Sequence, residues 1–366
     1  MNPLRVAIVG ATGYTGSELV RLLSNHPRVE LAAITSRSRA GEAFSDVHGA
    51  FRGIEDQPLV APDELPSKKI DLFFLALPHG ASMDFVAAQP AGGPPIIDLS
   101  GDFRLPDAAV YSAWYGQEHR ATERLDEAVF GLPELFREKL RQARLVANPG
   151  CYPTATILAL APLVRRGLIR ARGLVVDAKS GVTGAGATAK TITHFPAVFG
   201  DFRAYGLLRH RHTPEIESVL SRLGGAEAQV LFTPHLLPVD RGILATCYAE
   251  PATAAGDAGA AKRAGGAKLA GNEATAFAEK IAAAYQEDYA DEPFVRVVDQ
   301  PPSIKQVRGS NYCDVHATHD PRTGRVLAMA AIDNLVKGAA GQAVQNMNLV
   351  CGWPETTGLT QGPLIP

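Results

Sequence analysis

The feature that most constrains the fold is a glycine-rich turn near the N-terminus. An apolar run typical of a buried strand, Val6–Val9, leads into the segment GATGYTG at positions 10–16, and a helical pattern over Ser17–Leu23 follows. Glycines at such a bend let the backbone approach a pyrophosphate, to which the first N–H groups of the helix can donate. The spacing is GxxGxxG rather than GxGxxG, so a tight turn without a ligand stays open as the alternative. The pattern indicates the first βα unit of a dinucleotide-binding sheet.

The remainder of the first 150 residues repeats this alternation of strand and helix. Strand-like runs follow at Val29–Ile34, Asp71–Leu77, Ile96–Leu99 and Leu145–Ala147. Helical stretches lie between several of them. Such alternation predicts an α/β domain with a Rossmann-type, doubly wound parallel sheet over residues 1–150.

The pattern changes after residue 150. A helical stretch over Thr154–Leu163 is followed by a succession of strands with one clear helix among them, Ala274–Gln286. This order predicts a second, α+β domain over residues 151–333, with a mixed, largely antiparallel sheet. The Ala/Gly-rich stretch 251–271 indicates a surface insertion, with a weak helix as the alternative. The strand-like runs are Leu174–Lys179, Val230–Thr233, Ile243–Ala249, Val295–Val298, Tyr312–Thr318 and Val326–Ile332.

Composition excludes several classes of protein. A chain of 366 residues with 46% hydrophobic and 20% charged residues suits two globular domains rather than a disordered chain. The formal net charge of −2 argues against a nucleic-acid or membrane-surface binder, and no apolar run is long enough to span a membrane. The four cysteines are scattered without a CxxC pair, so neither a metal site nor a disulfide framework is expected. We therefore expect a cytoplasmic protein.

The residues after the second strand favour one cofactor over its close relative. An NAD-binding sheet usually carries an acidic residue there for the ribose 2′-hydroxyl. This chain has TSRSR at 35–39, with no acid, and a guanidinium with hydroxyls suits a 2′-phosphate. NADP(H) is therefore predicted, unless Arg37 and Arg39 are solvated loop charges.

A candidate nucleophile lies where another strand meets a helix. The segment NPGCYPT at 148–154 places Cys151 near a helix N-terminus, whose dipole lowers a thiol pKa and favours the thiolate. A buried structural cysteine is the alternative, and it is the role expected for Cys247, Cys313 and Cys351. A thiolate beside a nicotinamide cofactor indicates attack on an acyl carbon, followed by reduction of the thioester to an aldehyde.

Such chemistry needs a proton shuttle and cations for an anionic substrate. The cluster HRHTPEI at 210–216 places His212 just before a predicted helix, with His210 and the more distant His79 as other candidates. Arg104 and Arg241 could hold a carboxylate or phosphate, or serve as ordinary ion-pair partners. The segment SGVTGAG at 180–186 could form a backbone nest for phosphate, or a flexible loop.

These motifs, taken together and in order, resemble the N-acetyl-γ-glutamyl-phosphate reductase family, which is related to aspartate-semialdehyde dehydrogenase. The likeness runs from about Leu4 to Gly358. A related family of lysine biosynthesis reduces a carrier-linked aminoadipyl phosphate, and the present family is favoured over it by Pro149, Tyr152, Pro153 and the Pro214-Glu215 pair. The motifs that carry the resemblance are GATGYTG (10–16), LPHG (77–80), DLSGDFR (98–104), NPGCYPT (148–154), HRHTPEI (210–216) and DNLVKGAAGQA (333–343).

The resemblance implies NADPH-dependent reduction of N-acetylglutamyl 5-phosphate to the 5-semialdehyde, with release of phosphate, in arginine biosynthesis. It implies that Cys151 is the nucleophile and that His212 is the general acid/base. It also implies that the chain from residue 334 rejoins the nucleotide domain, and that the second sheet builds a homodimer or homotetramer. Reductases of aspartyl phosphate or carrier-linked aminoadipyl phosphate, and a non-catalytic NADP-sensing protein, are the competing hypotheses.

The resemblance and the motifs together predict a full set of ligand-binding residues. The expected substrate ligands are Arg104, Asn148, Arg211 and Arg241. The expected cofactor ligands are Gly10, Thr12, Gly13, Tyr14, Thr15, Gly16, Ser36, Arg37, Ser38, Leu77, Pro78, Ser180, Gly181, Asn334 and Gly338.

Overall fold

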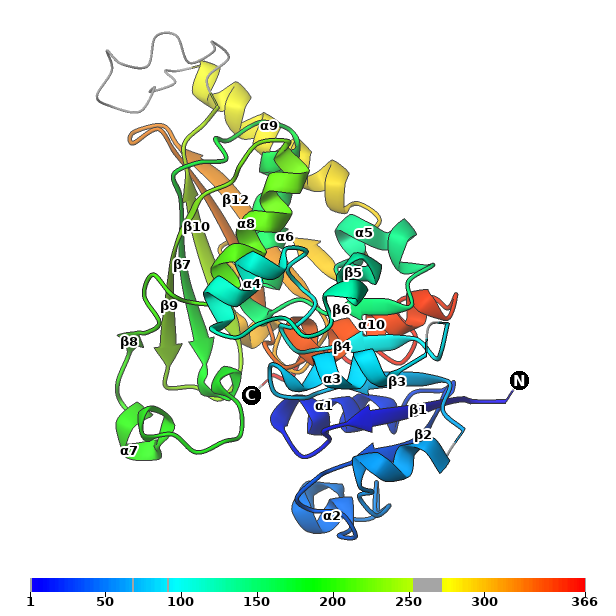
Figure 1. The fold of residues 1–366 in the computed structure, drawn as a ribbon. Coiled ribbons are helices and arrows are strands. Elements are labelled where there is room, and N and C mark those ends of the chain that lie inside the picture. Colours follow the sequence, from blue (N-terminus) through cyan, green and yellow to red (C-terminus); the bar gives the residue numbers. More distant parts are fainter. Residues whose placement is uncertain (1, 68, 91, 253–271, 366) are drawn as a thin grey trace.

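The computed structural model describes residues 2–67, 69–90, 92–252 and 272–365. Within these residues the chain forms two β-sheets that lie side by side (Figure 1). Most of the Ala/Gly-rich stretch expected as an insertion, residues 253–271, lies outside the described residues.

The first sheet has six parallel strands in the order β2-β1-β3-β4-β6-β5. Its strands are β1 (Leu4–Val9), β2 (Val29–Thr35), β3 (Leu72–Leu75), β4 (Ile96–Asp98), β5 (Ala128–Phe130) and β6 (Leu145–Ala147). The helices between them are α1 (Tyr14–Leu23), α2 (Phe44–Val47), α3 (Ala81–Ala88), α4 (Ala108–Tyr115) and α5 (Pro133–Leu140).

Both faces of this sheet are buried because its strands are apolar at consecutive positions. In β1, Val6 and Ile8 pack into a core with Leu19 of α1. Ala7 and Val9 point the other way, into a core that contains Met83 of α3. A parallel sheet covered on both faces is the doubly wound arrangement that the sequence predicted, and the structure confirms it.

The second sheet has seven strands in the order β11-β12-β13-β10-β7-β9-β8. Two neighbouring pairs, β11–β12 and β7–β9, are parallel and the other four are antiparallel, so the predicted mixed, largely antiparallel sheet is confirmed. Its strands are β7 (Leu174–Gly181), β8 (Arg203–Ala204), β9 (Val230–Leu237), β10 (Ile243–Ala249), β11 (Val295–Val297), β12 (Cys313–Asp320) and β13 (Arg325–Ile332).

Helices cover one face of this second sheet (Figure 1). Val176 and Ala178 of β7 are buried in the core that contains Ile157 of α6, whereas the alternate residues Val175 and Asp177 stay partly exposed. The alternation is that of a sheet with one covered and one open face. The helices of this part are α6 (Cys151–Arg165), α7 (Phe195–Val198), α8 (His212–Gly224) and α9 (Asn272–Tyr289).

The C-terminal segment returns to the first sheet. After β13 the chain forms a π-helical turn over Val336–Ala340 and then α10 (Gly341–Val350), which packs against α1 and α5. Val344 and Met347 of α10 share a buried core with β1. The implied return of the chain from residue 334 to the nucleotide domain thus matches the structure, but the π-helical turn was not foreseen.

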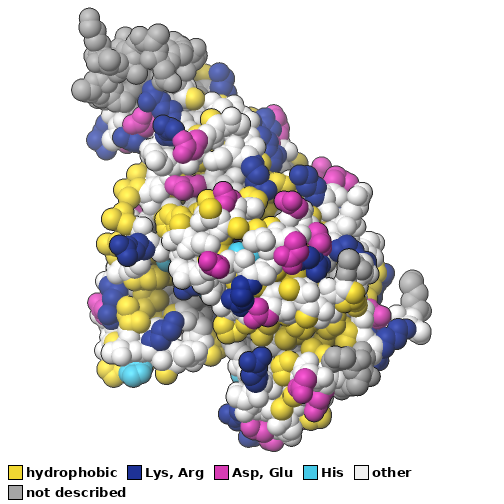
Figure 2. Space-filling view, viewed as in Figure 1, with side chains coloured by type: hydrophobic (Ala, Val, Ile, Leu, Met, Phe, Trp, Pro, Cys, Tyr) yellow, Lys and Arg dark blue, Asp and Glu magenta, His cyan; other side chains and the backbone are white. Residues whose placement is uncertain are grey.

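The surface carries mixed charges on the face seen in Figure 2, where basic and acidic side chains are interspersed. Several exposed hydrophobic side chains occur in the segment around α7 and β8, namely Phe195, Phe199, Phe202, Leu207 and Leu208. No helix in the described part of the chain has both the length and the apolar character needed to cross a membrane.

Candidate active site

A cavity of about 710 Å³ lies between the two sheets and is lined by residues from both. Thirteen of the predicted site residues belong to its wall: Gly13, Tyr14, Thr15, Gly16, Leu77, Pro78, Arg104, Asn148, Cys151, Arg211, His212, Asn334 and Gly338. The other predicted residues lie outside the wall: Gly10, Thr12, Ser36, Arg37, Ser38, Ser180, Gly181 and Arg241.

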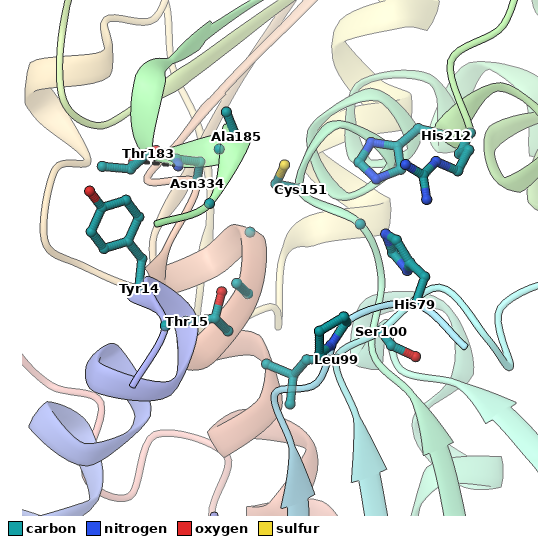
Figure 3. Close-up of a pocket in the computed structure, with 18 of the residues that line it drawn as sticks. Tyr14, Thr15, His79, Leu99, Ser100, Cys151, Thr183, Ala185, His212 and Asn334 are labelled. Carbon is teal, nitrogen blue, oxygen red and sulfur yellow. Dashed lines mark hydrogen bonds between the residues drawn. The ribbon is translucent and has the colours of Figure 1, made fainter. Parts of the chain in front are cut away.

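Cys151 is the first residue of α6, with Gly150 as the N-cap, as expected for a cysteine at a helix N-terminus. In Figure 3 it lies between Tyr14, Thr183 and Asn334 on one side and His212 on the other. Two glycines make room for this arrangement. A Cβ at Gly150 would overlap the His212 ring, and a Cβ at Gly338 would lie 2.8 Å from the Cys151 Cβ.

The electrostatics of Cys151 differ from the prediction. Burial raises the pKa of the Cys151 thiol to about 11, although the Arg104 guanidinium and the backbone N–H groups at the start of α6 act to lower it. The helix terminus alone therefore does not produce a thiolate at neutral pH. A base in the cavity must accept the thiol proton.

His212, the predicted general acid/base, is the first residue of α8 and lines the same cavity. Its Nδ1 is buried and has no hydrogen-bond partner among the described residues, which leaves a lone pair or a proton available. Burial, with the neighbouring His210, Arg104, His79 and Arg211, holds the pKa of His212 well below its ordinary value. The imidazole is therefore neutral at pH 7 and able to accept a proton.

The other two candidate histidines are engaged elsewhere. The Nδ1 of His210 accepts a hydrogen bond from the His212 backbone N–H at 3.2 Å, and burial with Arg211 lowers its pKa to about 4. The Nδ1 of His79 accepts from the Gly101 N–H at 2.9 Å. Both rings line the cavity, but each has one nitrogen occupied by the backbone.

A buried ion pair lies next to Cys151. Arg104 donates to the carbonyls of Asn148 and Leu99, both at 2.8 Å, and its Nη1 is 3.4 Å from Glu215 Oε2. Glu215 in turn accepts from the Gly150 N–H at 2.8 Å. Burial would lower the pKa of Arg104, but Glu215 and other nearby groups raise it, so a permanent cation faces the cavity.

The glycine-rich turn has the shape needed to approach a phosphate. Gly10 has a φ of +93°, and a Cβ there would lie 2.6 Å from the Ala76 carbonyl oxygen. Gly16 packs directly against Gly10 and Ala11, where a side chain would not fit. The N-cap of α1 is Gly13, which has no side chain to cap the helix, so the first N–H groups of α1 are open to a ligand.

The segment after β2 lies beside this turn without entering the cavity wall. Thr35 accepts from the Ala11 N–H through its carbonyl at 2.9 Å and from the Gly10 N–H through its hydroxyl at 3.2 Å. Ser36 is buried, while Arg37 and Ser38 are exposed. Arg39, by contrast, forms an ion pair with Glu42 at 2.7 Å.

Three of the predicted ligands are held by other parts of the protein. The Asn148 side chain donates to the Ala339 carbonyl at 3.2 Å and accepts from Asn346 at 3.0 Å. The Ser180 hydroxyl donates to the Gly181 carbonyl. Arg241 lies outside the cavity wall in an ion-pair cluster.

Sequence reasoning missed several residues of the wall. Tyr115, Tyr205, Lys190 and Arg209 all line the cavity, and the Arg211 guanidinium lies 5.3 Å from the centre of the Tyr115 ring. None of the four belongs to a motif that carries the resemblance. Glu215 was part of a quoted motif, but only folding brings it to Gly150.

Comparison with known proteins agrees with this geometry. A family model described as "Semialdehyde dehydrogenase, NAD binding domain" matches residues 5–143, and one described as "Semialdehyde dehydrogenase, dimerisation domain" matches residues 151–265 and 266–334. Among solved structures, aspartate semialdehyde dehydrogenase II from Vibrio cholerae, complexed with ASA, has a TM-score of 0.69 and 16% identity, covering 96% of this chain and 99% of that one.

A second structural neighbour, aspartate semialdehyde dehydrogenase with NADP from Candida albicans, has a TM-score of 0.66 and 15% identity, again over 96% of this chain and 99% of that one. Curated sequences are much closer. The N-acetyl-gamma-glutamyl-phosphate reductase of Desulfotalea psychrophila is 48% identical over 99% of this chain and 100% of its own length. That of Syntrophobacter fumaroxidans is 49% identical with the same coverage. The chain therefore belongs to the N-acetyl-γ-glutamyl-phosphate reductase family.

Proposed function

We propose that this chain reduces N-acetyl-L-glutamyl 5-phosphate to N-acetyl-L-glutamate 5-semialdehyde and phosphate, using NADPH, as a step of arginine biosynthesis. The observation that carries the proposal is the position of Cys151. It opens onto one cavity together with the uncapped N-terminus of α1, the neutral imidazole of His212 and the cation of Arg104.

NADP(H) fits the residues on the cofactor side of the cavity. The N–H groups of Gly13 to Gly16 suit the pyrophosphate, and the exposed Arg37, with Ser36 and Ser38, suits the 2′-phosphate. When bound, NADPH supplies the hydride that turns the thioester into the aldehyde. Leu77, Pro78, Asn334 and Gly338 line the same cavity as Cys151, whereas Gly10, Thr12, Ser180 and Gly181 lie outside its wall.

The protein's own groups carry the remaining steps. His212 accepts the thiol proton, and the Cys151 thiolate attacks the acyl carbon of the acyl phosphate. The carbon–oxygen bond to phosphate breaks, and His212 returns its proton to the departing phosphate oxygen. Arg104 and Arg211 neutralise the substrate's anionic groups in the cavity. After reduction the regained thiolate takes up a proton from water through His212.

The two sheets suggest different roles for the two parts of the chain. Residues 1–150 with 334–366 would bind the nucleotide, and residues 151–333 would carry catalysis and association of subunits. The open face of the seven-stranded sheet, where side chains such as Val175, Thr233 and Thr246 are half-buried, supports a homodimer or homotetramer built through that face. A biosynthetic enzyme of this kind is expected in the cytoplasm.

Mutation of Cys151 to alanine tests the covalent mechanism. We expect turnover to fall by at least about 10⁴-fold while NADPH binding, followed by fluorescence titration, is retained. The matched control is Cys351→Ser, which changes a half-buried cysteine outside the cavity and is expected to leave turnover unchanged. Near-normal rates in Cys151→Ala would rule out the thioester.

The substrate is tested by mass spectrometry and by the reverse reaction. Wild-type protein mixed with N-acetylglutamyl phosphate without NADPH should gain the mass of the acyl group on the peptide that contains Cys151. Oxidation of each semialdehyde with NADP and phosphate distinguishes the competing substrates. Preference for aspartate semialdehyde or a carrier-linked aminoadipate semialdehyde would replace the proposed substrate, and cofactor binding without any oxidation would favour a sensor.

A further inference from the structure

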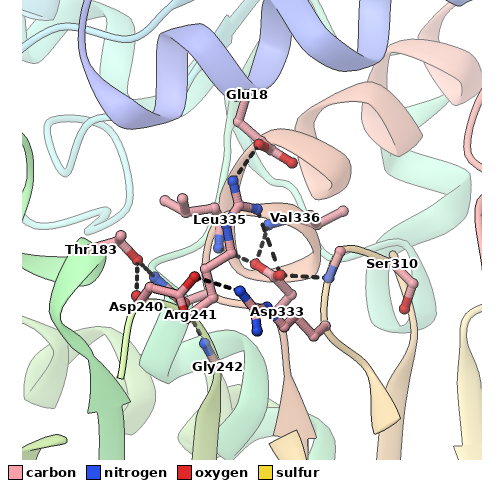
Figure 4. Close-up of polar contacts among 12 residues, drawn as sticks. Glu18, Thr183, Asp240, Arg241, Gly242, Ser310, Asp333, Leu335 and Val336 are labelled. Carbon is pink, nitrogen blue, oxygen red and sulfur yellow. Dashed lines mark hydrogen bonds and ion pairs between the residues drawn. The ribbon is translucent and has the colours of Figure 1, made fainter. Parts of the chain in front are cut away.

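Arg241 connects α1, the helix whose N-terminus faces the cavity, to the segment at Asp333 (Figure 4). It lies in the loop between β9 and β10, and its Nη2 donates to Glu18 Oε2 at 2.8 Å. Glu18 is on α1, within about a turn of the Gly13–Gly16 residues that line the cavity, and its side chain is only 3% exposed. The contact therefore fixes the helix whose N-terminus faces the cofactor.

The same guanidinium approaches a second buried carboxylate. Its Nη1 is 3.6 Å from Asp333 Oδ2, and Asp333 is fully buried. Asp333 Oδ1 accepts from the N–H groups of Leu335 and Val336, at 2.8 and 3.2 Å. Asp333 thus binds the backbone at the start of the π-helical turn whose Gly338 packs against Cys151.

The backbone beside Arg241 contacts residues of the cavity wall. The Gly242 N–H donates to Asn334 Oδ1 at 2.7 Å, and Asn334 Nδ2 donates to the Thr183 hydroxyl at 2.9 Å. The Thr183 hydroxyl donates to the Asp240 carbonyl at 2.6 Å. Since Thr183 and Asn334 line the cavity, the loop that contacts α1 through Arg241 also contacts the cavity wall.

The link between α1 and the segment at Asp333 depends on Arg241, because both of its carboxylate partners are buried. Burial would raise the pKa of Glu18, but the hydrogen bonds from Arg241 and Arg21 hold it below its ordinary value, so Glu18 is a buried anion. Without Arg241, Glu18 would keep Arg21, but Asp333 would lose the one cation with which it forms an ion pair among the described residues. A buried carboxylate without its partner is costly, so the two segments would move apart or admit water.

We infer that Arg241 is a positioning residue that sets the spacing between the N-terminus of α1 and the segment that packs on Cys151. It acts through Glu18 and Asp333 and does not contact the substrate, in contrast to the prediction from sequence. The identity of the cofactor in this inference rests on the proposed function. The inference explains why an arginine outside the cavity wall has two carboxylates from different parts of the chain as partners.

The test is NADPH affinity in Arg241→Gln and Arg241→Lys. We expect the Kd for NADPH, measured by fluorescence titration, to rise about 2- to 30-fold in Arg241→Gln, the range typical of residues that couple sites without touching a ligand. Arg241→Lys keeps the charge and should recover part of the affinity. The KM for phosphate and for the semialdehyde in the reverse reaction should stay within about twofold of wild type.

Arg308→Ala is the matched control. Arg308 pairs with Asp240 of the same loop at 2.6 Å, but the two side chains are 41% and 56% exposed and the pair does not reach α1. We expect its NADPH affinity to equal that of wild type. Glu18→Gln should raise the Kd as Arg241→Gln does, and the double variant should be no worse than the stronger single one. If Arg241→Gln does not fold, as judged by circular dichroism, Glu18→Gln and Arg241→Lys carry the test.

Two results would overturn the inference. A raised KM for phosphate or semialdehyde with an unchanged Kd for NADPH would make Arg241 a substrate ligand after all. Unchanged NADPH affinity in both Arg241→Gln and Glu18→Gln would show that the cluster does not position the cofactor helix. Failure of the proposed function would appear instead in the wild type, as a lack of acyl-phosphate chemistry, while the NADPH titrations would still decide the role of Arg241.

Discussion

Two buried ion pairs flank Cys151, and they differ in how completely their charges are satisfied. On one side, Glu215 accepts from the N–H of Gly150, the residue before Cys151, and its ion pair with Arg104 is long, at 3.4 Å. Arg104 lines the cavity. Its outer nitrogen is thus only loosely held by protein and can turn to an anionic ligand.

On the other side, Lys337 precedes the Gly338 that packs on Cys151. Its ammonium donates to Glu134 at 2.6 Å and to Gln345 at 2.8 Å, and it lies 5.7 Å from the centre of the Phe294 ring. Lys337 and Glu134 are both fully buried as side chains, and neither lines the cavity.

The difference suggests that the Arg104 charge is available to a ligand, whereas the Lys337 charge serves the fold. A buried ion pair is a poor source of net stability, because desolvation offsets the attraction, but it is very sensitive to loss of one partner. Loss of one partner of the Lys337 pair should therefore lower the free energy of unfolding. Changes to Arg104 should instead affect the reactivity of Cys151 and the binding of anions.

The largest effect on the cavity side is expected from His212→Asn. Asparagine keeps a polar side chain of similar size but cannot shuttle a proton, so turnover should fall by about 10²- to 10⁴-fold. The low pKa of His212 keeps the wild-type ring neutral to well below pH 6.5. The acid limb of the wild-type kcat/KM profile should therefore have its midpoint below pH 6.5.

In His212→Asn that acid limb should disappear. The residual rate should instead rise with pH toward the thiol pKa near 11, because only the spontaneously formed thiolate reacts. His210→Asn is the control, and its acid limb should persist. If the acid limb of the kcat/KM profile disappeared only in His210→Asn, the proton transfer would be assigned to His210 instead.

The core pair is tested by Lys337→Met. Methionine fills much of the same volume but leaves Glu134 buried without its cation, so the free energy of unfolding should fall by about 3–5 kcal/mol. Denaturant unfolding followed by circular dichroism measures it. The control is Arg141→Ala, which removes an exposed ion pair with Glu138 at the C-terminal end of α5 and should cost less than about 1 kcal/mol.

The double variant Lys337→Met/Glu134→Leu sharpens the test. Removing both charges leaves no unpaired carboxylate, so it should be more stable than Lys337→Met alone. A double variant less stable than the single one would mean that the network beyond Glu134, through Gln345 and Glu355, needs the carboxylate for itself.

Local patterns account for how much of the fold the sequence could predict. The run Leu145–Ala147 coincides with β6, and Ile243–Ala249 coincides with β10, because each is a short apolar run. The strand β5 and the helix α5 were missed, since a three-residue strand and a helix with polar residues on its outer side leave little periodic signal. The π-helical turn at 336–340 was also missed, because packing against Cys151 and the hydrogen bonds of Asp333 with the backbone at its start shape it.

The candidate site likewise has features that local sequence predicts and features that only folding creates. Cys151 and the α1 turn were found because glycine at a strand-to-helix junction is a local signal. The raised pKa of Cys151 was not foreseen, since it depends on burial that only the folded cavity creates. The partners of Glu215 and Arg241 are Gly150 and Glu18, which lie 65 and 223 residues away in the chain, so no motif could reveal them.

The smallest expected effect concerns the influence of Arg104 on the nucleophile. Its guanidinium acts to lower the pKa of Cys151, so Arg104→Gln should raise that pKa further and slow alkylation by iodoacetamide by up to about tenfold at pH 8. Arg104→Lys keeps the charge and should alkylate nearly as fast as wild type. Both belong in a Cys351→Ser background, because the half-buried Cys351 also has a pKa raised to about 11 and would add to the signal. Equal rates in the Gln and Lys variants would mean that Arg104 acts on the substrate alone, and the contrast between the two ion pairs would then rest on ligand binding rather than on the thiol.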